Sequence, residues 1–299
     1  MLTRMVMVLG FGVAACQSGN GSAEGALDWT TVQDSTDRIA SVTGFMGPEA
    51  VRFDPEADVF FVSNFNGSGG ERDANGFISR VSAEGSIEEL EFAVGTELYP
   101  LHAPRGMYIQ ADTLWVADAD GVHGFDRRSG DQLSFADFTS FEPGFLNDVA
   151  AGPGGALYVT DTGRSRIYRL AAGQVTIAVE DSLLGPPNGI TWYGTIGQFL
   201  LAPWQGQQQL RAWNPATGEL TDFVESPGGF FDGIEVVDGN VIVASQADSS
   251  LHVFSDRTTR QIVKLPGRPA DIGIDRRRTR VAVPYVALNQ VDIWQLPVN

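Results

Sequence analysis

The chain has 299 residues, of which 43% are apolar, 19% are charged and 35 are glycines. This composition is typical of a turn-rich globular protein and excludes an intrinsically disordered chain. The formal net charge is −17, and because so acidic a surface repels phosphate backbones, we expect no nucleic-acid partner.

The N-terminal segment resembles a bacterial lipoprotein signal. Arg4 precedes a short apolar run over residues 5–11, and small residues ending in Ala15 lead into Cys16, the only cysteine. The run is shorter than the roughly 20 apolar residues of a membrane-spanning helix. We therefore predict that residues 1–15 are a signal peptide and that Cys16 is lipidated. The alternative is an ordinary secretory peptide cleaved after Ala15, which would leave a free thiol.

The signal also implies a location and a partner. Gln17, rather than aspartate, follows the cysteine, which in the lipoprotein pattern favours the outer membrane. We expect a protein of the bacterial cell envelope that is anchored by the acyl chains on Cys16, on the periplasmic face of the outer membrane. A Gly/Ser-rich tether over residues 16–26 would separate this anchor from one domain over residues 27–299. Strand-like segments open that domain at 27–31 and Arg38–Thr43.

A four-residue motif then recurs six times, at intervals of 38 to 56 residues. Its copies are Pro48-Glu49-Ala50-Val51, Pro104-Arg105-Gly106-Met107, Leu146-Asn147-Asp148-Val149, Pro187-Asn188-Gly189-Ile190, Phe231-Asp232-Gly233-Ile234 and Pro269-Ala270-Asp271-Ile272. A period of about forty residues is typical of propeller blades with four strands each. The sequence therefore predicts an all-β fold, a six-bladed β-propeller with four-stranded antiparallel blades. Arg38–Thr43 would pair with the last blade and close the ring, since an exposed edge would otherwise remain.

Each repeat is expected to contain the same strands. The motif opens the innermost strand, and a nearly continuous apolar segment suited to a strand buried on both faces follows it. These second strands are predicted at 59–63, 113–117, 156–160, 198–202, 240–244 and 280–283. Third strands ending in an apolar residue are predicted at 77–81, 122–125, 166–170, 210–213, 251–254 and 291–294. No pattern of a long helix occurs.

In this topology the loop after each second strand lies on the same face as the motif. The longest and most glycine-rich of these loops, 64–76, is a candidate lid. Asn64, Trp204 and Tyr285 stand at the starts of such loops and His102 lies shortly before the blade-two motif, so we predict that they contact a substrate. The alternative is that the aromatic residues pack blade edges and that His102 is a hydrogen-bonded loop residue.

Several other polar residues are predicted to be structural. They are Asp118 and Asp161 in turns, Asp148 and Asp271 between blades, and His123 and His252 in third strands.

The second motif position carries side chains that should converge at the axis of the ring. In blade order they are Glu49, Arg105, Asn147, Asn188, Asp232 and Ala270. Two carboxylates and two amides offer hard oxygen ligands, which suit Ca²⁺ with its roughly six to eight oxygens. We predict that Glu49, Asn147, Asn188 and Asp232 bind a divalent metal, Ca²⁺ in the first place and Mg²⁺ or Mn²⁺ as alternatives. Zn²⁺ would require histidine or cysteine, which the ring lacks.

The order of these residues resembles the regucalcin/gluconolactonase family of six-bladed propellers, with diisopropylfluorophosphatase and serum paraoxonase as distant relatives. The resemblance spans residues 39–296 and is carried by Gly47-Pro48-Glu49, Leu146-Asn147-Asp148, Pro187-Asn188-Gly189 and Phe231-Asp232-Gly233. It implies that Glu49, Asn188 and Asp232 bind the catalytic metal, with Asn147 as a further ligand or water-holder. It also implies a lactone as the usual substrate, with phosphoesters and organophosphates for some members.

Two ring positions depart from the family pattern. Arg105 could form a salt bridge with Glu49 or Asp232 that replaces the metal. It could instead clamp an anionic substrate or stabilise a developing oxyanion. Ala270 leaves the sixth position empty, so paraoxonase-like chemistry with a ring histidine is not expected.

Together these residues predict a divalent-metal-dependent hydrolase of the gluconolactonase type that acts on a lactone or related ester. The metal would polarise the carbonyl and Asp232 would act as general base, while Arg105 and the mouth loops would orient the small-molecule substrate. The alternative is a non-catalytic binding or assembly propeller of the cell envelope, in which Arg105 replaces the metal.

Overall fold

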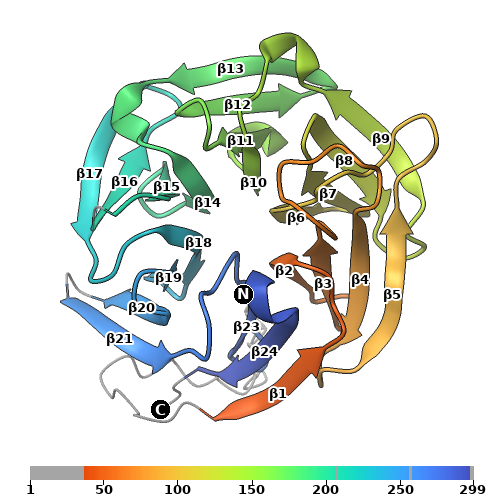
Figure 1. The fold of residues 1–299 in the computed structure, drawn as a ribbon. Helices are drawn as coiled ribbons and strands as arrows, with labels where there is room; N and C mark the ends of the chain where they lie inside the picture. The colour runs from red at the N-terminus through yellow and green to blue at the C-terminus, as the bar shows by residue number, and fades with distance from the viewer. Residues whose placement is uncertain (1–36, 207, 256–257, 297–299) are drawn as a thin grey trace, which may run out of the picture.

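The computed structural model describes residues 37–206, 208–255 and 258–296, which form a ring of six four-stranded antiparallel sheets (Figure 1). The predicted all-β fold and the number of blades are confirmed. Within the described residues the only helical segments are short 3₁₀ turns, at Thr139–Phe141, Pro153–Gly155, Ser182–Leu184 and Val286–Leu288. None of these described segments has the length and apolar character needed to span a membrane. The predicted signal peptide, Cys16, the tether and segment 27–31 lie outside the described residues.

The strands follow one another from the axis outward in each of the first five blades. Blades one and two consist of β2 (Pro48–Asp54), β3 (Val59–Asn64), β4 (Phe77–Ser82), β5 (Ile87–Val94), β6 (Met107–Gln110), β7 (Thr113–Ala117), β8 (Gly121–Asp126) and β9 (Gln132–Asp137). Blades three and four consist of β10 (Leu146–Ala151), β11 (Leu157–Asp161), β12 (Arg166–Ala171), β13 (Gln174–Glu180), β14 (Pro187–Tyr193), β15 (Gln198–Pro203), β16 (Gln209–Trp213) and β17 (Leu220–Glu225). Blade five consists of β18 (Phe231–Val237), β19 (Asn240–Ser245), β20 (Ser250–Ser255) and β21 (Thr258–Lys264). The predicted second and third strands agree with these bounds to within two residues at each end.

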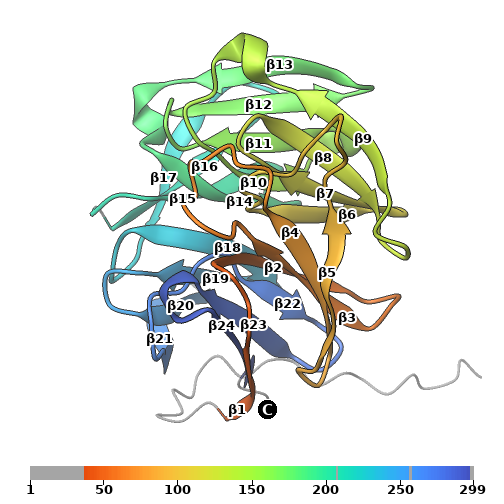
Figure 2. The same cartoon turned by 45° about the vertical axis from the view of Figure 1, so that its right-hand side comes forward.

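The sixth blade is completed by both ends of the described chain. It consists of β22 (Gly273–Asp275), β23 (Arg280–Tyr285), β24 (Gln290–Gln295) and, as its outer strand, β1 (Arg38–Thr43). β1 pairs antiparallel with β24, with Val42 opposite Val291 (Figures 1 and 2). The predicted closure of the ring is therefore confirmed, and the last blade has no unpaired edge at this position.

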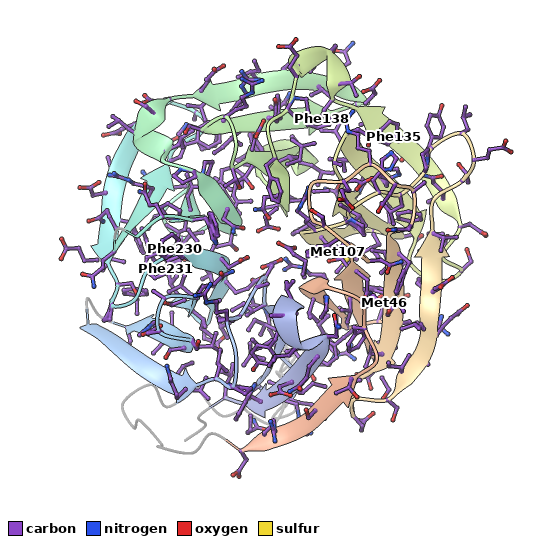
Figure 3. The ribbon with its side chains drawn as sticks, in the orientation of Figure 1. Met46, Met107, Phe135, Phe138, Phe230 and Phe231 are labelled. Carbon is purple, nitrogen blue, oxygen red and sulfur yellow. The ribbon has the colours of Figure 1, made fainter. Side chains whose placement is uncertain are left out.

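Apolar side chains fill the spaces between neighbouring sheets (Figure 3). Between blades three and four, the ring of Tyr158 lies 4.6 Å from that of Phe199, which in turn stacks on Trp213 at 5.7 Å. All three are nearly inaccessible to solvent, so this contact excludes water from the joint between the two blades. Packing of this kind holds the inner ends of the blades in fixed positions around the axis.

Glycine follows the second motif residue in blades two, four and five because the next inner strand lies very close. A Cβ at Gly189 would stand 2.2 Å from the carbonyl oxygen of Asp232, and one at Gly233 would stand 2.4 Å from the backbone nitrogen of Ile272. No larger residue fits at either position without moving backbone. These glycines therefore set how closely the second-position side chains of neighbouring blades approach one another.

Candidate metal-binding and active site

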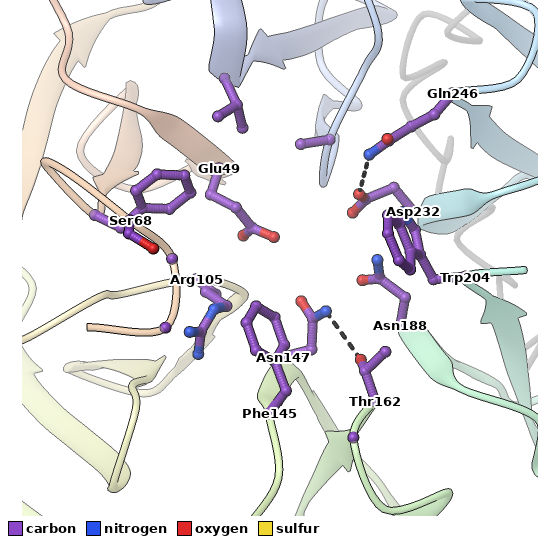
Figure 4. A pocket seen from close by; sticks show the side chains of 16 residues that line it. Glu49, Ser68, Arg105, Phe145, Asn147, Thr162, Asn188, Trp204, Asp232 and Gln246 are labelled. Carbon is purple, nitrogen blue, oxygen red and sulfur yellow. Dashed lines mark hydrogen bonds between the residues drawn. The ribbon is translucent and has the colours of Figure 1, made fainter. Parts of the chain in front are cut away.

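The inner ends of the blades surround a cavity of about 470 Å³, a size within the range of roughly 300–1,000 Å³ that is usual for small-molecule sites. Glu49, Asn147, Asn188 and Asp232, here called the oxygen ring, line it and turn their polar ends toward one common space (Figure 4). Each of the four is between 3% and 7% exposed. Residues separated by up to 183 positions in the chain thus meet in one small volume.

Register shifts in the inner strands turn these side chains toward the axis. The register between first and second strands shifts at all four positions, between Pro48 and Ala50, Leu146 and Val149, Pro187 and Gly189, and Phe231 and Ile234. Such a bulge interrupts the regular alternation of side chains and redirects one of them. In blade two, by contrast, Arg105 precedes the first strand, which begins at Met107. The four oxygen-bearing residues therefore share the same local feature, a register shift between the first and second strands of their blade.

Several oxygens of the ring have no partner within the described chain. Oε2 of Glu49, Oδ1 of Asn188 and Oδ1 of Asp232 are buried and accept no hydrogen bond there. Buried polar atoms without partners are rare because losing their contacts with water costs about 1–3 kcal/mol each. Three such atoms around one space indicate that a ligand from outside the chain completes the site.

Two neighbouring side chains fix the orientation of the ring. The side-chain amide of Asn147 donates to Oγ1 of Thr162 at 3.0 Å, which leaves the amide oxygen of Asn147 on the cavity side (Figure 4). The side-chain amide of Gln246 donates to Oδ2 of Asp232 at 2.8 Å and leaves Oδ1 toward the cavity. The amide oxygen of Asn147 and Oδ1 of Asp232 therefore face the cavity.

Burial and mutual repulsion act on both carboxyl groups. Burial raises the pKa of Asp232 to about 7, an effect that the hydrogen bond from Gln246 opposes and the charge of Asp148 strengthens. Burial and the charge of Asp232 raise the pKa of Glu49 well above its usual range, although Arg105 counteracts this in part. A divalent cation among these oxygens would stabilise the charged forms and lower both pKa values.

The donor set fits a hard divalent cation. Two carboxylates and two amide oxygens match the preferences of Ca²⁺, which completes its shell with water or substrate oxygens. Nitrogen and sulfur ligands of the kind that Zn²⁺ prefers are absent from the residues that line this cavity. The unpartnered oxygens, the net charge of the ring and the identity of its ligands thus agree with one another.

Arg105 lies at the wall of the cavity, but its guanidinium is turned away from the oxygen ring (Figure 4). Nη1 donates to the carbonyl oxygen of Leu146 at 2.7 Å, and the charged group stacks over the ring of Phe145 at 3.8 Å. Within the described residues Arg105 forms no ion pair with Glu49 or Asp232, so the alternative in which it replaces the metal finds no support. Burial lowers the pKa of Arg105, and the charge of Glu49 opposes that shift.

Of the other predicted substrate contacts, only Trp204 lines the cavity, where it is 43% exposed. Asn64 is buried and uses its side chain to bind the backbone of Met46 and Val62. Tyr285, on β23, is fully buried between blades five and six, and its hydroxyl accepts from the indole of Trp294. These positions place Asn64 and Tyr285 outside the cavity, so neither can contact a ligand bound there.

His102 is also outside the cavity and is held by the loop around it. Its Nδ1 accepts from the backbone N–H of Ala74 at 3.0 Å, and its Nε2 lies 3.6 Å from Oδ2 of Asp120. Because Nδ1 accepts, the ring proton of neutral His102 is on Nε2. This matches the alternative of a satisfied loop histidine and not a substrate contact.

Several residues of the cavity were not singled out from the sequence, four of them with polar or aromatic side chains. Thr162 and Gln246 follow the second strands of blades three and five, Phe145 precedes the blade-three motif, and Ser68 belongs to the loop 64–76. The rule that loops after second strands reach the mouth could have found Thr162 and Gln246. The roles of these two residues depend on hydrogen bonds across a blade, which no local sequence pattern encodes.

A second group of possible ligands, Asp118, Asp120 and His123, lies in blade two. Oε1 of Gln132 accepts from the backbone N–H of Thr96 at 3.1 Å, so its amide nitrogen is the atom 2.6 Å from Nδ1 of His123. Nδ1 therefore accepts, and the proton of neutral His123 is on Nε2, 3.3 Å from Oδ2 of Asp118. A protonated nitrogen cannot bind a metal, so this tautomer disfavours a second metal site.

Both carboxylate oxygens of Asp118 also accept hydrogen bonds from the backbone. They accept from the N–H groups of His102 at 2.8 Å and Ala103 at 2.6 Å, which ties down the loop before the blade-two motif. Burial would raise the pKa of Asp118, but the nearby imidazole of His123 and the hydrogen bonds from the two N–H groups hold it below its usual value. The predicted structural role of Asp118 agrees with this arrangement.

The sequence matches no protein-family model and no curated protein. Its fold resembles several solved structures. A gluconolactonase from Xanthomonas campestris superposes with a TM-score of 0.65 and 17% identity over 87% of this chain and 91% of that one. A putative gluconolactonase gives 0.65 and 18% over 86% and 91%, and virginiamycin B lyase from Staphylococcus aureus gives 0.61 and 13% over 86% and 98%. At these identities the comparison confirms the gluconolactonase-like propeller fold and says nothing of the reaction, which depends on the residues of the cavity.

Proposed function

We propose that the protein is a divalent-metal-dependent hydrolase of the gluconolactonase type that acts on a lactone or related ester. The observation that carries the proposal is the convergence of Glu49, Asn188 and Asp232, whose buried oxygens lack partners in the described chain, on one space of the cavity. The likeness in fold to gluconolactonases supports the same assignment. Fold alone would not suffice, because propellers carry many unrelated functions.

Glu49, Asn147, Asn188 and Asp232 would hold the cation, for which Ca²⁺ fits best and Mg²⁺ or Mn²⁺ are alternatives. When bound, such a cation supplies a Lewis acid that polarises an ester carbonyl. The residues of the cavity then have two tasks, which are to position the ester over the ring and to move one proton.

Asp232 is the proposed general base. Gln246 donates to its Oδ2, and Oδ1 faces the cavity, where one lone pair would hold the cation and the other would take a proton from the attacking water. The water oxygen forms a bond to the carbonyl carbon, the carbon–oxygen bond of the leaving group breaks, and Asp232 returns the proton to the departing alkoxide. Arg105, predicted to act on the substrate directly, instead positions Phe145 and the start of β10.

The cavity favours this chemistry over that of the lyases with the same fold. One lyase structure is described as catalytically inactive after replacement of a histidine by alanine. The three histidines of the present chain are His102, His123 and His252. None of the three lines the cavity, and a mechanism that uses a histidine there has no candidate residue.

The proposal is tested by the hydrolysis of lactones and aryl esters after EDTA treatment, with and without added CaCl₂. We expect turnover only with the cation, and its loss in Asp232→Asn. Asp120→Asn is the matched control, since Asp120 belongs to the acidic group in blade two. Turnover that survives both chelation and Asp232→Asn would refute the proposal.

We further propose that Cys16 anchors the propeller to the periplasmic face of the outer membrane of a bacterium, as its sequence context indicates. The full-length protein should partition into the detergent phase of a Triton X-114 extraction, and Cys16→Ser should shift it to the aqueous phase. An unmodified Cys16 in the mass spectrum of the purified protein would contradict this assignment.

A further inference from the structure

The walls of the cavity differ sharply from its floor. Beside the oxygen ring, the lining side chains include Phe65, Phe145, Trp204 and Val286, which come from the loops of blades one, three, four and six. Phe145 and Trp204 are labelled in Figure 4. Three of the four are aromatic, and aromatic walls bind apolar groups through large buried areas. A ligand that reaches the ring must therefore lie against an apolar surface.

Polar groups on these walls are largely engaged with the protein. Oγ1 of Thr162 donates to the carbonyl oxygen of Pro187 at 2.8 Å and accepts from Asn147. The amide nitrogen of Gln246 is bonded to Asp232. Of the wall residues that carry hydrogen-bonding side chains, this leaves the exposed hydroxyl of Ser68, the indole N–H of Trp204 and Oε1 of Gln246 for a ligand.

The positive charge nearest to the cavity is not offered to a ligand either. Arg105 is 1% exposed, donates to the carbonyl oxygen of Leu146 and is covered by the ring of Phe145 at 3.8 Å. A carboxylate or phosphate in the cavity would therefore find no counter-charge on the walls, and only the cation held by the oxygen ring, already balanced by two carboxylates, would face it.

The apolar wall continues to the rim. Trp204 contacts Phe230 edge to face at 5.5 Å, and the two are 43% and 41% exposed. Phe230 has a φ of 47°, in the left-handed region that bulky residues rarely occupy. Its backbone is held there by hydrogen bonds to Gln205 and Gln246. An exposed aromatic side chain kept in a strained conformation beside the mouth indicates a binding surface.

We propose that this cavity selects esters or lactones with an uncharged apolar substituent, such as an alkyl or aryl group, and rejects sugar lactones and anionic esters. The inference rests on the proposed hydrolase function and specifies its substrate class. The several hydroxyl groups of a sugar lactone would leave water for walls that offer only a few hydrogen-bonding groups, which disfavours such a substrate. Each methylene of an alkyl group would instead gain from contact with Trp204 and Phe230.

The test compares kcat/KM for γ-lactones with alkyl substituents of increasing length, for glucono-δ-lactone and for a carboxylate-bearing lactone, all with CaCl₂. We expect a rise of about threefold per methylene over the first few carbons and at least tenfold lower values for the sugar and anionic lactones. Trp204→Ala should flatten the dependence on chain length, whereas Leu133→Ala, at an exposed position on β9, should not change it.

The outcomes separate the two proposals. If glucono-δ-lactone is the better substrate, the apolar selectivity is wrong and the hydrolase function stands. If no lactone or ester is hydrolysed, the hydrolase function is wrong, and binding of the same compounds, measured by quenching of tryptophan fluorescence in the wild type and in Trp204→Phe, decides the selectivity. Tighter binding of the alkyl lactones, with loss of the signal in Trp204→Phe, would then support it, and equal or weaker binding would overturn it.

Discussion

The buried carboxylates at the two ends of the central channel differ in whether the chain supplies a cation beside them. At the cavity end, Glu49 and Asp232 face open space with oxygens that have no partner in the described chain. Three residues further along the same inner strands, Arg52 forms an ion pair with Glu235 and lies 3.6 Å from Oδ2 of Asp271. We call Arg52, Glu235 and Asp271 the far-end cluster.

The difference shows where a ligand is needed. Glu235 is 8% exposed and Glu49 is 7% exposed, so burial does not distinguish the two ends. The far-end cluster receives its cation from the chain, whereas the oxygen ring does not. A buried carboxylate without a counter-charge is unfavourable, and the cavity end can remove that penalty only by protonation or by binding a cation from solution.

The largest effect expected from this comparison is on turnover. Asp232→Asn removes the proposed base and one charge of the ring but keeps the size of the side chain. We expect kcat to fall by about 10²–10⁴-fold, the usual contribution of a general base, with a melting temperature equal to or above that of the wild type. Steady-state kinetics and calorimetry on the same preparation measure both. A normal kcat would show that the base is elsewhere.

The far-end cluster should respond in the opposite way. Arg52→Met removes the cation beside Asp271 and leaves Glu235 only Arg276, whose Nη2 lies 4.0 Å from Oε2 of Glu235. The loss should lower the free energy of unfolding by about 3 kcal/mol. Because Arg52 does not line the cavity, kcat should be unchanged at temperatures where the variant is folded. Urea denaturation gives the first quantity and initial rates give the second. A stable variant with impaired turnover would remove the distinction between the two ends.

Cation binding should stabilise the cavity end in a pH-dependent manner. The folded pKa of Asp232, about 7, exceeds its unfolded value of about 4, so without a cation stability from this group falls as pH rises from about 4 to 7. CaCl₂ at a hundredfold excess over its Kd should add about 2.7 kcal/mol, or roughly 5–10 °C in Tm, at pH 8. Competition by protons should abolish the shift at pH 5. Equal shifts at both pH values in thermal denaturation would speak against binding at the ring.

The smallest kinetic effect is expected at Arg105. If its guanidinium touched the reacting oxygen, its removal would lower kcat by about 10²–10³-fold. Because it instead contacts Phe145 and Leu146, we expect Arg105→Met to lower kcat/KM by less than about tenfold while it lowers Tm. A hundredfold loss of kcat with an unchanged Tm would restore the direct role.

The sequence was informative about repeated features and less so about single contacts. The motif period predicted six blades because each blade repeats the same packing, and the need to cover the edge of the last sheet predicted the closing strand. It also brought Glu49 and Asp232 together, since equivalent positions of a ring must converge. It could not predict that Arg105 turns away from the axis, because that depends on the carbonyl of Leu146 and the ring of Phe145. Tyr285 was misplaced because an aromatic residue at a strand end serves a blade interior as readily as a cavity wall.

The most direct test of the account is calorimetric titration of the EDTA-treated protein with CaCl₂ at pH 8. We predict one bound cation per chain, loss of binding in Glu49→Gln and unchanged binding in Asp120→Asn, the control in the acidic group of blade two. Absence of binding in the wild type, or binding that survives Glu49→Gln and disappears in Asp120→Asn, would contradict the claim that the oxygen ring is a cation site.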